Sequence, residues 1–212
     1  MAGARRVFLA ATAAVAAGSE GLRLYLNLSR SDPQHSLAWR LVDFFSYFTN
    51  TTGVLVALVA GAAVWRPDSG LARPGAFAAT SVYALVVAVT YQLLLRGDPH
   101  GLALVADTGQ HILTPALIIL AWLWFTPKPG QAWGAPLAWL AYPAAYIVWI
   151  LLRGAMTHRY PYFFANVDKL GYPHALFNGA LFLAAFYLLG LGAVATGRLG
   201  GAPRAQAVAA RR

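Results

Sequence analysis

Six long apolar stretches, separated by short segments rich in proline, glycine and charge, dominate this chain of 212 residues. They are residues 7–28, 39–64, 76–96, 101–125, 136–153 and 174–195. A helix needs about 20 mostly apolar residues to cross the hydrocarbon core of a bilayer, and each stretch approaches or exceeds that length. We therefore predict an all-α integral membrane bundle of six transmembrane helices, forming one domain over 1–196. The basic tail 197–212 is expected to be disordered.

Composition agrees with a membrane location. Only 11% of the residues are charged, against about 25% in soluble domains. The absence of cysteine excludes disulfides, a cysteine nucleophile and thiolate metal sites. The formal net charge is +9, but the basic residues are spread over loops and termini. This pattern suits contact with anionic headgroups, so we expect no nucleic-acid partner, and no protein partner is indicated.

The first residues, MAGARRVFLAATAAVAAGSEG, have the arginines, apolar run and small residues of a secretory signal. Apolar character resumes at LRLYLNL, however, which favours an uncleaved first helix. The side with both termini and the loops after the second and fourth segments carries nine Lys or Arg and one acid, Asp68. The positive-inside rule therefore predicts both termini in the cytoplasm. The Ala-, Gly-, Arg- and Pro-rich composition favours a bacterial inner membrane, so the location expected is the cell membrane.

Polar side chains interrupt the outer halves of five segments, most densely in FFSYFTNTTG (44–53). They are Glu20, Arg23 and Asn27; Asp43, Ser46, Tyr47, Thr49 and Asn50; Tyr91 and Gln92; Asp107, Gln110, His111 and Thr114; and His174 and Asn178. A charge at mid-membrane costs about 2.5–3.5 kcal/mol. At about 100° per residue, the first, second and fourth segments each show a polar stripe. We therefore expect the stripes to line one cavity that opens toward the outer leaflet.

Two of these residues are expected at the same depth in the membrane. Thr49 and His111 each lie about ten residues from the outer end of their segment, so both are about 15 Å deep. A hydroxyl and an imidazole at equal depth can meet, and Asp107, one turn before His111, can orient the ring. Plainer readings stay open: an intramembrane threonine often bonds its own backbone, and Glu20–Arg23 can be a structural pair.

Three stretches together resemble a known family. They are FFSYFTNTTGVLVAL, DTGQHILTPALIILAWLWF and YPAAYIVWILLRGAMTHRYPYFFANVDKLGY. In order and spacing they are similar to the androgen-induced and androgen-dependent TFPI-regulating proteins, most closely to the bacterial branch. The resemblance covers about residues 40–185. It implies a six-helix hydrolase of fatty acid esters of hydroxy fatty acids, with a threonine nucleophile and a histidine base.

Carried onto this chain, the resemblance implies that Thr49, in YFT, is the nucleophile and that His111, in HILTP, is the base. The substrate is then a lipid from the bilayer, and neither a metal nor another cofactor is expected. Supporting roles fall to Asp107, Asp43, Glu20 and Arg23, with Asn50, Gln110 and Tyr47 as candidate oxyanion donors. Substrate contacts are expected from Thr114, His174 and Asn178.

Two other functions stay open. A zinc-dependent intramembrane hydrolase would use His111, His174 and Asp107 as ligands. Only one of these histidines is deep in the membrane, whereas catalytic zinc usually has three protein ligands. A non-enzymatic protein that binds or transports lipid would use the same polar cavity to hold a headgroup.

Overall fold

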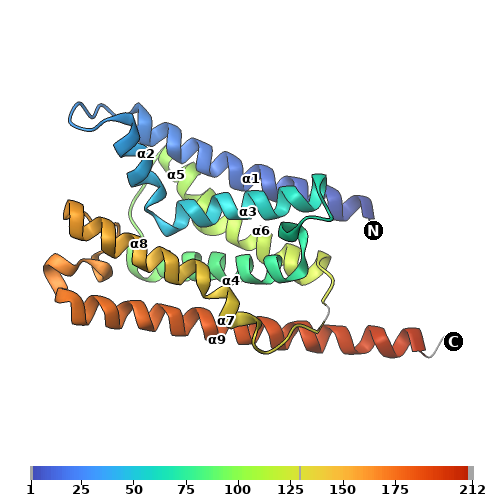
Figure 1. The fold of residues 1–212 in the computed structure, drawn as a ribbon. Helices are drawn as coiled ribbons and strands as arrows, with labels where there is room; N and C mark the ends of the chain where they lie inside the picture. The colour runs from blue at the N-terminus through green and yellow to red at the C-terminus, as the bar shows by residue number, and fades with distance from the viewer. Residues whose placement is uncertain (1, 129, 210–212) are drawn as a thin grey trace. The chain divides into compact units, whose positions relative to one another are not determined.

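The computed structural model describes residues 2–128 and 130–209, and it contains helices and loops but no strand within these ranges (Figure 1). Two compact units divide the chain, Met1–Pro127 and Lys128–Arg212. The first contains α1 (Ala2–Ser29), α2 (Leu37–Phe45), α3 (Phe48–Trp65), η1 (Gly70–Ala72), α4 (Pro74–Thr90), η2 (Tyr91–Leu95), α5 (Leu102–Thr108), η3 (Gly109–Leu113), α6 (Thr114–Leu120) and η4 (Ala121–Phe125). The second contains α7 (Ala135–Trp139), α8 (Ala141–Thr157), η5 (Phe163–Ala165) and α9 (Val167–Ala209).

Six stretches of the described chain are long and apolar enough to cross a membrane. They are Gly3–Ser29, Phe48–Trp65, Pro74–Leu95, Leu102–Phe125, Ala135–Thr157 and Val167–Arg198. The predicted all-α bundle with six spans is therefore confirmed. The last span starts earlier than predicted, with a kink at Gly171, whose φ of 74° suits a residue without Cβ. α9 then continues to Ala209, through most of the segment expected to be a tail, while residues 210–212 lie outside the described range.

The prediction of one continuous helix over 39–64 is wrong, because the chain breaks between α2 and α3 at Ser46 and Tyr47. Tyr47 is extended, with φ −91° and ψ 127°, and it caps α3 without a side-chain hydrogen bond. The polar stripe calculated for an unbroken second segment therefore does not apply across residues 46–47. α2 itself begins at a serine cap, since the Ser36 hydroxyl accepts a hydrogen bond from the Trp39 backbone N–H at 3.2 Å.

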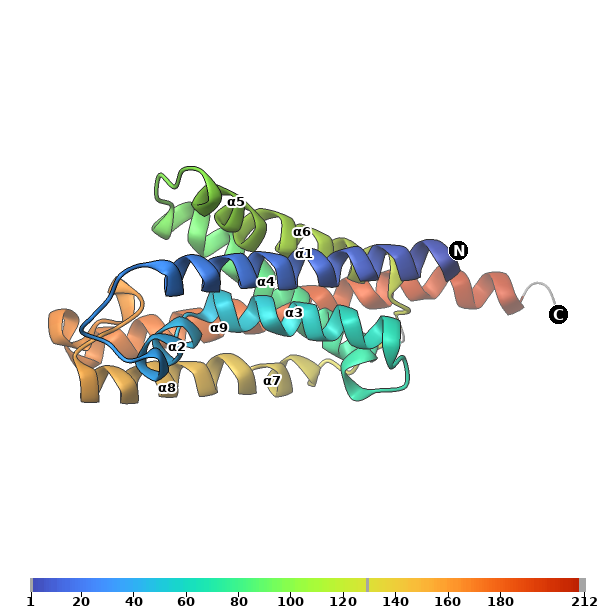
Figure 2. The same ribbon diagram turned by 90° about the horizontal axis from the view of Figure 1, so that it is seen from above.

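The first unit is held together by close packing of small and branched side chains. α1 packs along α3, as Figures 1 and 2 show, and Ala16 of α1 and Val56 and Val59 of α3 are fully buried. α4 packs against α6, where the Ser81 hydroxyl donates to the Ile118 carbonyl at 3.2 Å. Small residues of this kind let membrane helices approach, since lipid provides no hydrophobic force between them.

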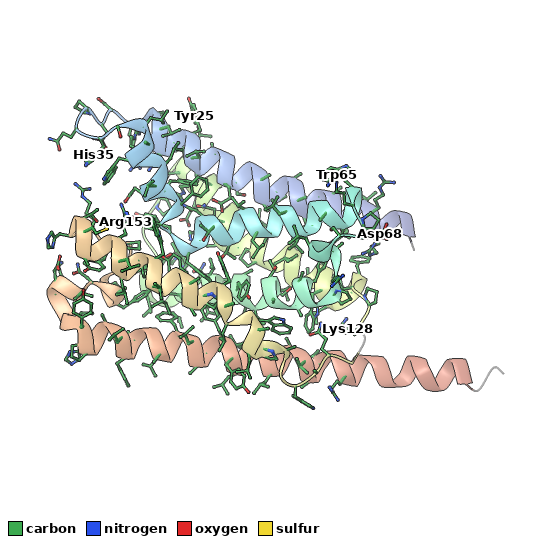
Figure 3. All side chains as sticks on the ribbon, in the orientation of Figure 1. Tyr25, His35, Trp65, Asp68, Lys128 and Arg153 are labelled. Carbon is green, nitrogen blue, oxygen red and sulfur yellow. The ribbon has the colours of Figure 1, made fainter. Side chains whose placement is uncertain are left out.

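Exposed aromatic side chains mark the two ends of the first unit. Figure 3 shows Tyr25 and His35 at one end and Trp65 and Asp68 at the other. Tyr25 is 62% exposed and Trp65 is 70% exposed. Aromatic rings with one polar atom favour the headgroup level on both sides of a bilayer, so these positions fit a unit that spans the membrane.

Candidate functional site

Polar side chains near the helix break donate hydrogen bonds to backbone carbonyls on both sides of it. The Asn50 Nδ2 group donates to the Phe44 carbonyl at 2.7 Å, in a buried position. The Ser46 hydroxyl donates to the Val42 carbonyl at 2.7 Å. The Thr51 hydroxyl lies 3.2 Å from the Phe48 carbonyl. A carbonyl without a partner is costly in lipid, so part of the hydroxyl and amide content of 44–53 stabilises an interrupted helix.

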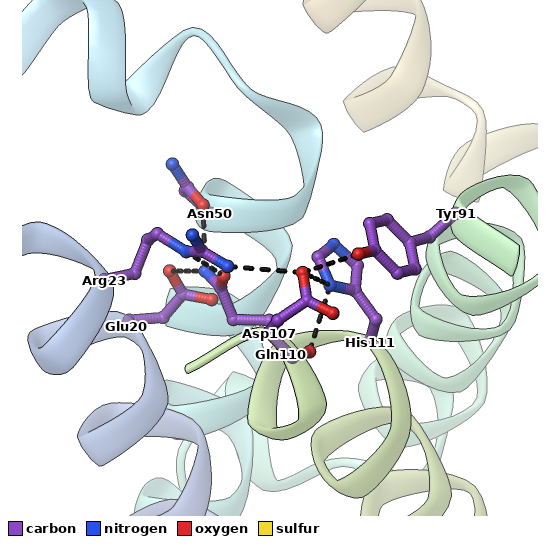
Figure 4. Close-up of polar contacts among 7 residues, drawn as sticks. All are labelled: Glu20, Arg23, Asn50, Tyr91, Asp107, Gln110 and His111. Atoms are coloured by element: carbon purple, nitrogen blue, oxygen red, sulfur yellow. Dashed lines mark hydrogen bonds and ion pairs between the residues drawn. The ribbon is translucent and has the colours of Figure 1, made fainter. Parts of the chain in front are cut away.

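Gln110 joins α1, α3 and η3 by hydrogen bonds (Figure 4). Its Nε2 group donates to Glu20 Oε2 at 2.8 Å and to Asn50 Oδ1 at 3.0 Å. Its Oε1 atom accepts from Arg23 Nε at 2.8 Å. Both amide hydrogens are therefore engaged, and Gln110 positions its neighbours and does not present a free donor to a substrate.

Asp107 binds three partners from three elements. Its Oδ1 atom accepts a hydrogen bond from the Tyr91 hydroxyl at 2.7 Å, and Arg23 Nη2 lies 3.3 Å from the same atom. His111 Nδ1 lies 3.3 Å from that oxygen. The carboxylate thus lies beside the ring that it was expected to orient, and the orienting role itself stays a prediction. The carboxylate, the guanidinium and the phenol form one connected network with Gln110 (Figure 4).

His111 lies in the π-helical turn η3 and is 8% exposed. π-turns inside α-helices are frequent at functional sites, because they leave carbonyls free and redirect side chains. Here His111 Nδ1 lies 3.0 Å from the Asp107 backbone carbonyl, and the ring stacks on Tyr91 with centroids 3.5 Å apart and planes at 9°. Both oxygens next to Nδ1 are acceptors, so a neutral ring carries its hydrogen on Nδ1. Nε2 then keeps its lone pair.

Two glycines allow the helices to approach closely enough for this network. A Cβ at Gly53 of α3 would lie 1.9 Å from Glu20 Oε1, and one at Gly109 would lie 2.1 Å from the Ser19 hydroxyl oxygen. Neither distance leaves room for a side chain. The glycines therefore bring α3 and η3 against α1, next to Glu20 and Gln110.

Thr49 lies in the first turn of α3, directly before Asn50, and is half-buried. Within the part of the chain that the structure describes, its hydroxyl makes no hydrogen bond. The backbone-bonding role considered for this threonine is therefore not seen, in contrast to Ser46 and Thr51. The contact predicted between Thr49 and His111 stays a prediction.

Of the other predicted residues, three lie in the first unit and two in the second. Asp43 and Tyr47 flank the break, and each makes interactions with other groups. Thr114 is 3% exposed, and its hydroxyl is buried without a hydrogen-bond partner in the described structure. His174 and Asn178 belong to the second unit and bond its own backbone, His174 Nδ1 to the Leu170 carbonyl at 3.1 Å and Asn178 Nδ2 to the Phe164 carbonyl at 2.8 Å.

Tyr91 received no role from the sequence, although it lies in the outer half of its span with the other polar residues. Its ring stacks on His111, and its hydroxyl holds Asp107. A phenol at this position also suits an interface anchor, so residue type alone does not reveal the contact. Its position beside the other polar residues was the available signal.

No group of three or more His, Cys, Asp or Glu side chains in residues 2–128 and 130–209 is arranged to hold a metal ion. The zinc alternative therefore gains no support from these side chains. Six spans and a buried network of charged and amide side chains define a multi-pass helical membrane protein with a polar site in its first unit. No family model, no curated protein and no solved structure matches this chain.

Proposed function

We propose that the protein is an intramembrane lipid ester hydrolase in which His111 is the general base and Thr49 is the nucleophile. The observation that carries the proposal is the fixed imidazole. His111 Nδ1 lies 3.0 Å from the Asp107 carbonyl, and the ring stacks on Tyr91. A buried histidine with one nitrogen occupied and the other left as an acceptor has the arrangement that a general base needs.

The bond between Asn50 and Gln110 supports the pairing of Thr49 with His111. These two amides meet at 3.0 Å and join α3 directly to η3. Alternate spans run in the same direction, so the second and fourth spans are parallel. At about 100° per residue, the residue before Asn50 and the residue after Gln110 turn to the same side of that contact. Those residues are Thr49 and His111.

The proposed reaction is acyl transfer through a covalent intermediate. His111 Nε2 takes the proton of the Thr49 hydroxyl, and the oxygen attacks the ester carbonyl of a lipid. The alcohol leaves with the proton from His111, and water then hydrolyses the acyl-enzyme by the same route. Asn50 is the preferred donor to the oxyanion, because one Nδ2 hydrogen suffices for the Phe44 carbonyl and the other is left for a substrate.

The test is labelling of the purified protein in detergent with a fluorophosphonate probe. We expect labelling of the wild type and its loss, by about a hundredfold or more, in Thr49→Ala and in His111→Ala. Thr51→Ala is the matched hydroxyl control, since Thr51 bonds its own backbone, and His100→Ala is the control for an exposed histidine. Labelling that survives Thr49→Ala would exclude Thr49 as the nucleophile. Lipid binding without turnover of any ester would favour the non-enzymatic lipid carrier.

The proposal includes a cell-membrane location, in a bacterial inner membrane, with both termini in the cytoplasm. The charge asymmetry of the loops supports this orientation. Because the chain has no cysteine, single cysteines can be introduced and labelled without background. A cysteine at Asp68 should be blocked only by reagents that cross the membrane, and a cysteine at Asp98 should react from outside; the reverse result would contradict the orientation.

A further inference from the structure

An apolar groove on the first unit carries an inference about where a lipid chain binds. The groove has a volume of about 270 Å³ and lies between α1, α2 and α3. Its walls include Ala17, Gly21, Phe44, Phe45, Ala57 and Leu58. Glu20 also lines it, although nearly all of the wall surface is apolar. The groove therefore extends from the surface of two membrane spans to the network around Gln110, which binds Glu20 at 2.8 Å.

From this geometry we infer that the groove binds one acyl chain of a membrane lipid, with the polar end of that lipid near Glu20. Two residues of its wall, Phe45 and Leu58, are 43% and 53% exposed. The groove is thus continuous with the surface that these spans present to hydrocarbon. Apolar walls in that position favour an acyl chain, because the wall offers almost no donor or acceptor to a polar occupant.

Size excludes larger occupants. Pockets that hold a whole small molecule have volumes of about 300–1,000 Å³, so a groove of about 270 Å³ accepts one chain and not a complete lipid. A helix with its side chains is about 10–12 Å wide, and it cannot enter. A second copy of this protein can insert only single side chains here.

Gly21 provides a direct way to fill the groove. A Cβ at Gly21 meets no atom within 4 Å, so a larger side chain enters open space without a clash. Gly18, one turn earlier on α1, is equally open but is not part of the groove wall. Gly21→Leu and Gly18→Leu add the same atoms and the same helix propensity, and only the first occupies the groove.

The test uses the full chain in nanodiscs that contain phosphatidylcholine with a diazirine in one acyl chain. After illumination, adducts on α3 residues of the groove are mapped by mass spectrometry. We expect Gly21→Leu to lower their yield about tenfold or more, since a leucine displaces several methylenes. Gly18→Leu is expected to stay within about twofold of the wild type.

Equal yields in the two variants, or adducts spread evenly around α1, would overturn the inference. Oxidative dimers of an Ala57→Cys variant would also overturn it, because a second copy would then cover the groove. One further measurement rests on the proposed hydrolase function. Gly21→Leu should raise the KM for a long-chain ester about tenfold and leave that for a butanoyl ester unchanged. If the wild type were not labelled by the fluorophosphonate probe, the KM comparison would no longer apply. The adduct yields would still decide where the acyl chain binds.

Discussion

The second and fourth spans both carry a dense run of polar side chains, but they use them differently. Around the break between α2 and α3, Ser46, Asn50 and Thr51 bond carbonyls of their own segment. In α5 and η3, Asp107 and Gln110 bond side chains of other helices. A polar run in a membrane span can therefore stabilise an interrupted helix or build a site shared between helices.

Thr49 and Asn50 connect the two patterns. Asn50 takes part in both, because its Nδ2 atom binds the Phe44 carbonyl and its Oδ1 atom accepts from Gln110. In the part of the chain that is described, the Thr49 hydroxyl bonds neither a carbonyl of its own segment nor a side chain of another helix. The comparison thus leaves Thr49 with a hydroxyl that makes no hydrogen bond in the described structure, as the role of nucleophile that we propose for it requires.

The largest expected effect is that of Gln110→Leu, which removes the centre of the shared network. Glu20 and Asn50 each lose a partner while staying buried, and an orphaned buried group costs about 1–3 kcal/mol. We expect a loss of about 3 kcal/mol in the free energy of unfolding, measured in mixed micelles. Gln92→Leu, at an exposed glutamine, is the matched control. Similar losses in both variants would mean that the network does not stabilise the fold.

Asn50→Leu should have the next largest effect, lowering the free energy of unfolding by about 2 kcal/mol. The Phe44 carbonyl loses a donor and Gln110 loses an acceptor. Ser46→Ala removes the hydrogen bond to the Val42 carbonyl and should lower the free energy of unfolding by about 1 kcal/mol. The same unfolding measurement compares them. If Ser46→Ala were the more damaging change, the break would not depend on Asn50.

Gly53→Ala tests the close approach of α1 to α3. The added Cβ would lie 1.9 Å from Glu20 Oε1, and overpacking of this kind costs about 1–3 kcal/mol. Gly18→Ala, in open space, should instead stabilise the helix by up to about 1 kcal/mol. Equal thermal stability of the two variants would contradict the packing described for Glu20.

Tyr91→Phe separates the two contacts that Tyr91 makes. The ring still stacks on His111, but the hydrogen bond of 2.7 Å to Asp107 is lost. Loss of a hydrogen bond to a charged group corresponds to about 1.5 kcal/mol, so the rate of fluorophosphonate labelling should fall about tenfold. Tyr91→Leu should lower it further. Equal rates for the two variants would show that stacking has no role.

The smallest effect is expected outside the membrane, at the loop pair Asp32–His35. The hydrogen bond from His35, at 2.9 Å, lowers the pKa of the Asp32 carboxyl below its usual value. A lowered folded-state pKa stabilises the fold above the unfolded value of about 4, and this contribution is lost as the pH falls through the lowered pKa. Asp32→Asn should reduce stability slightly at pH 7, and the difference from wild type should vanish in acid. A difference that persists at low pH would contradict this.

Apolar run length and the placement of proline and glycine predicted the six spans. They succeeded because each span depends on local composition, and lipid requires every backbone group to be satisfied within the segment. The same reasoning failed at residues 46–47. No glycine or proline marks the break there, and the Asn50 amide that supports it acts from six residues beyond Phe44.

The sequence alone determined that this chain has six spans and that polar residues interrupt the first, second, third, fourth and sixth of them. Local hydrophobicity and spacing suffice for both. Tertiary structure alone decided which polar groups meet: Gln110 at the centre, Tyr91 against His111, and Gly53 under Glu20. These contacts join residues far apart in the chain, and their partners depend on how closely the helices pack, which no single segment encodes.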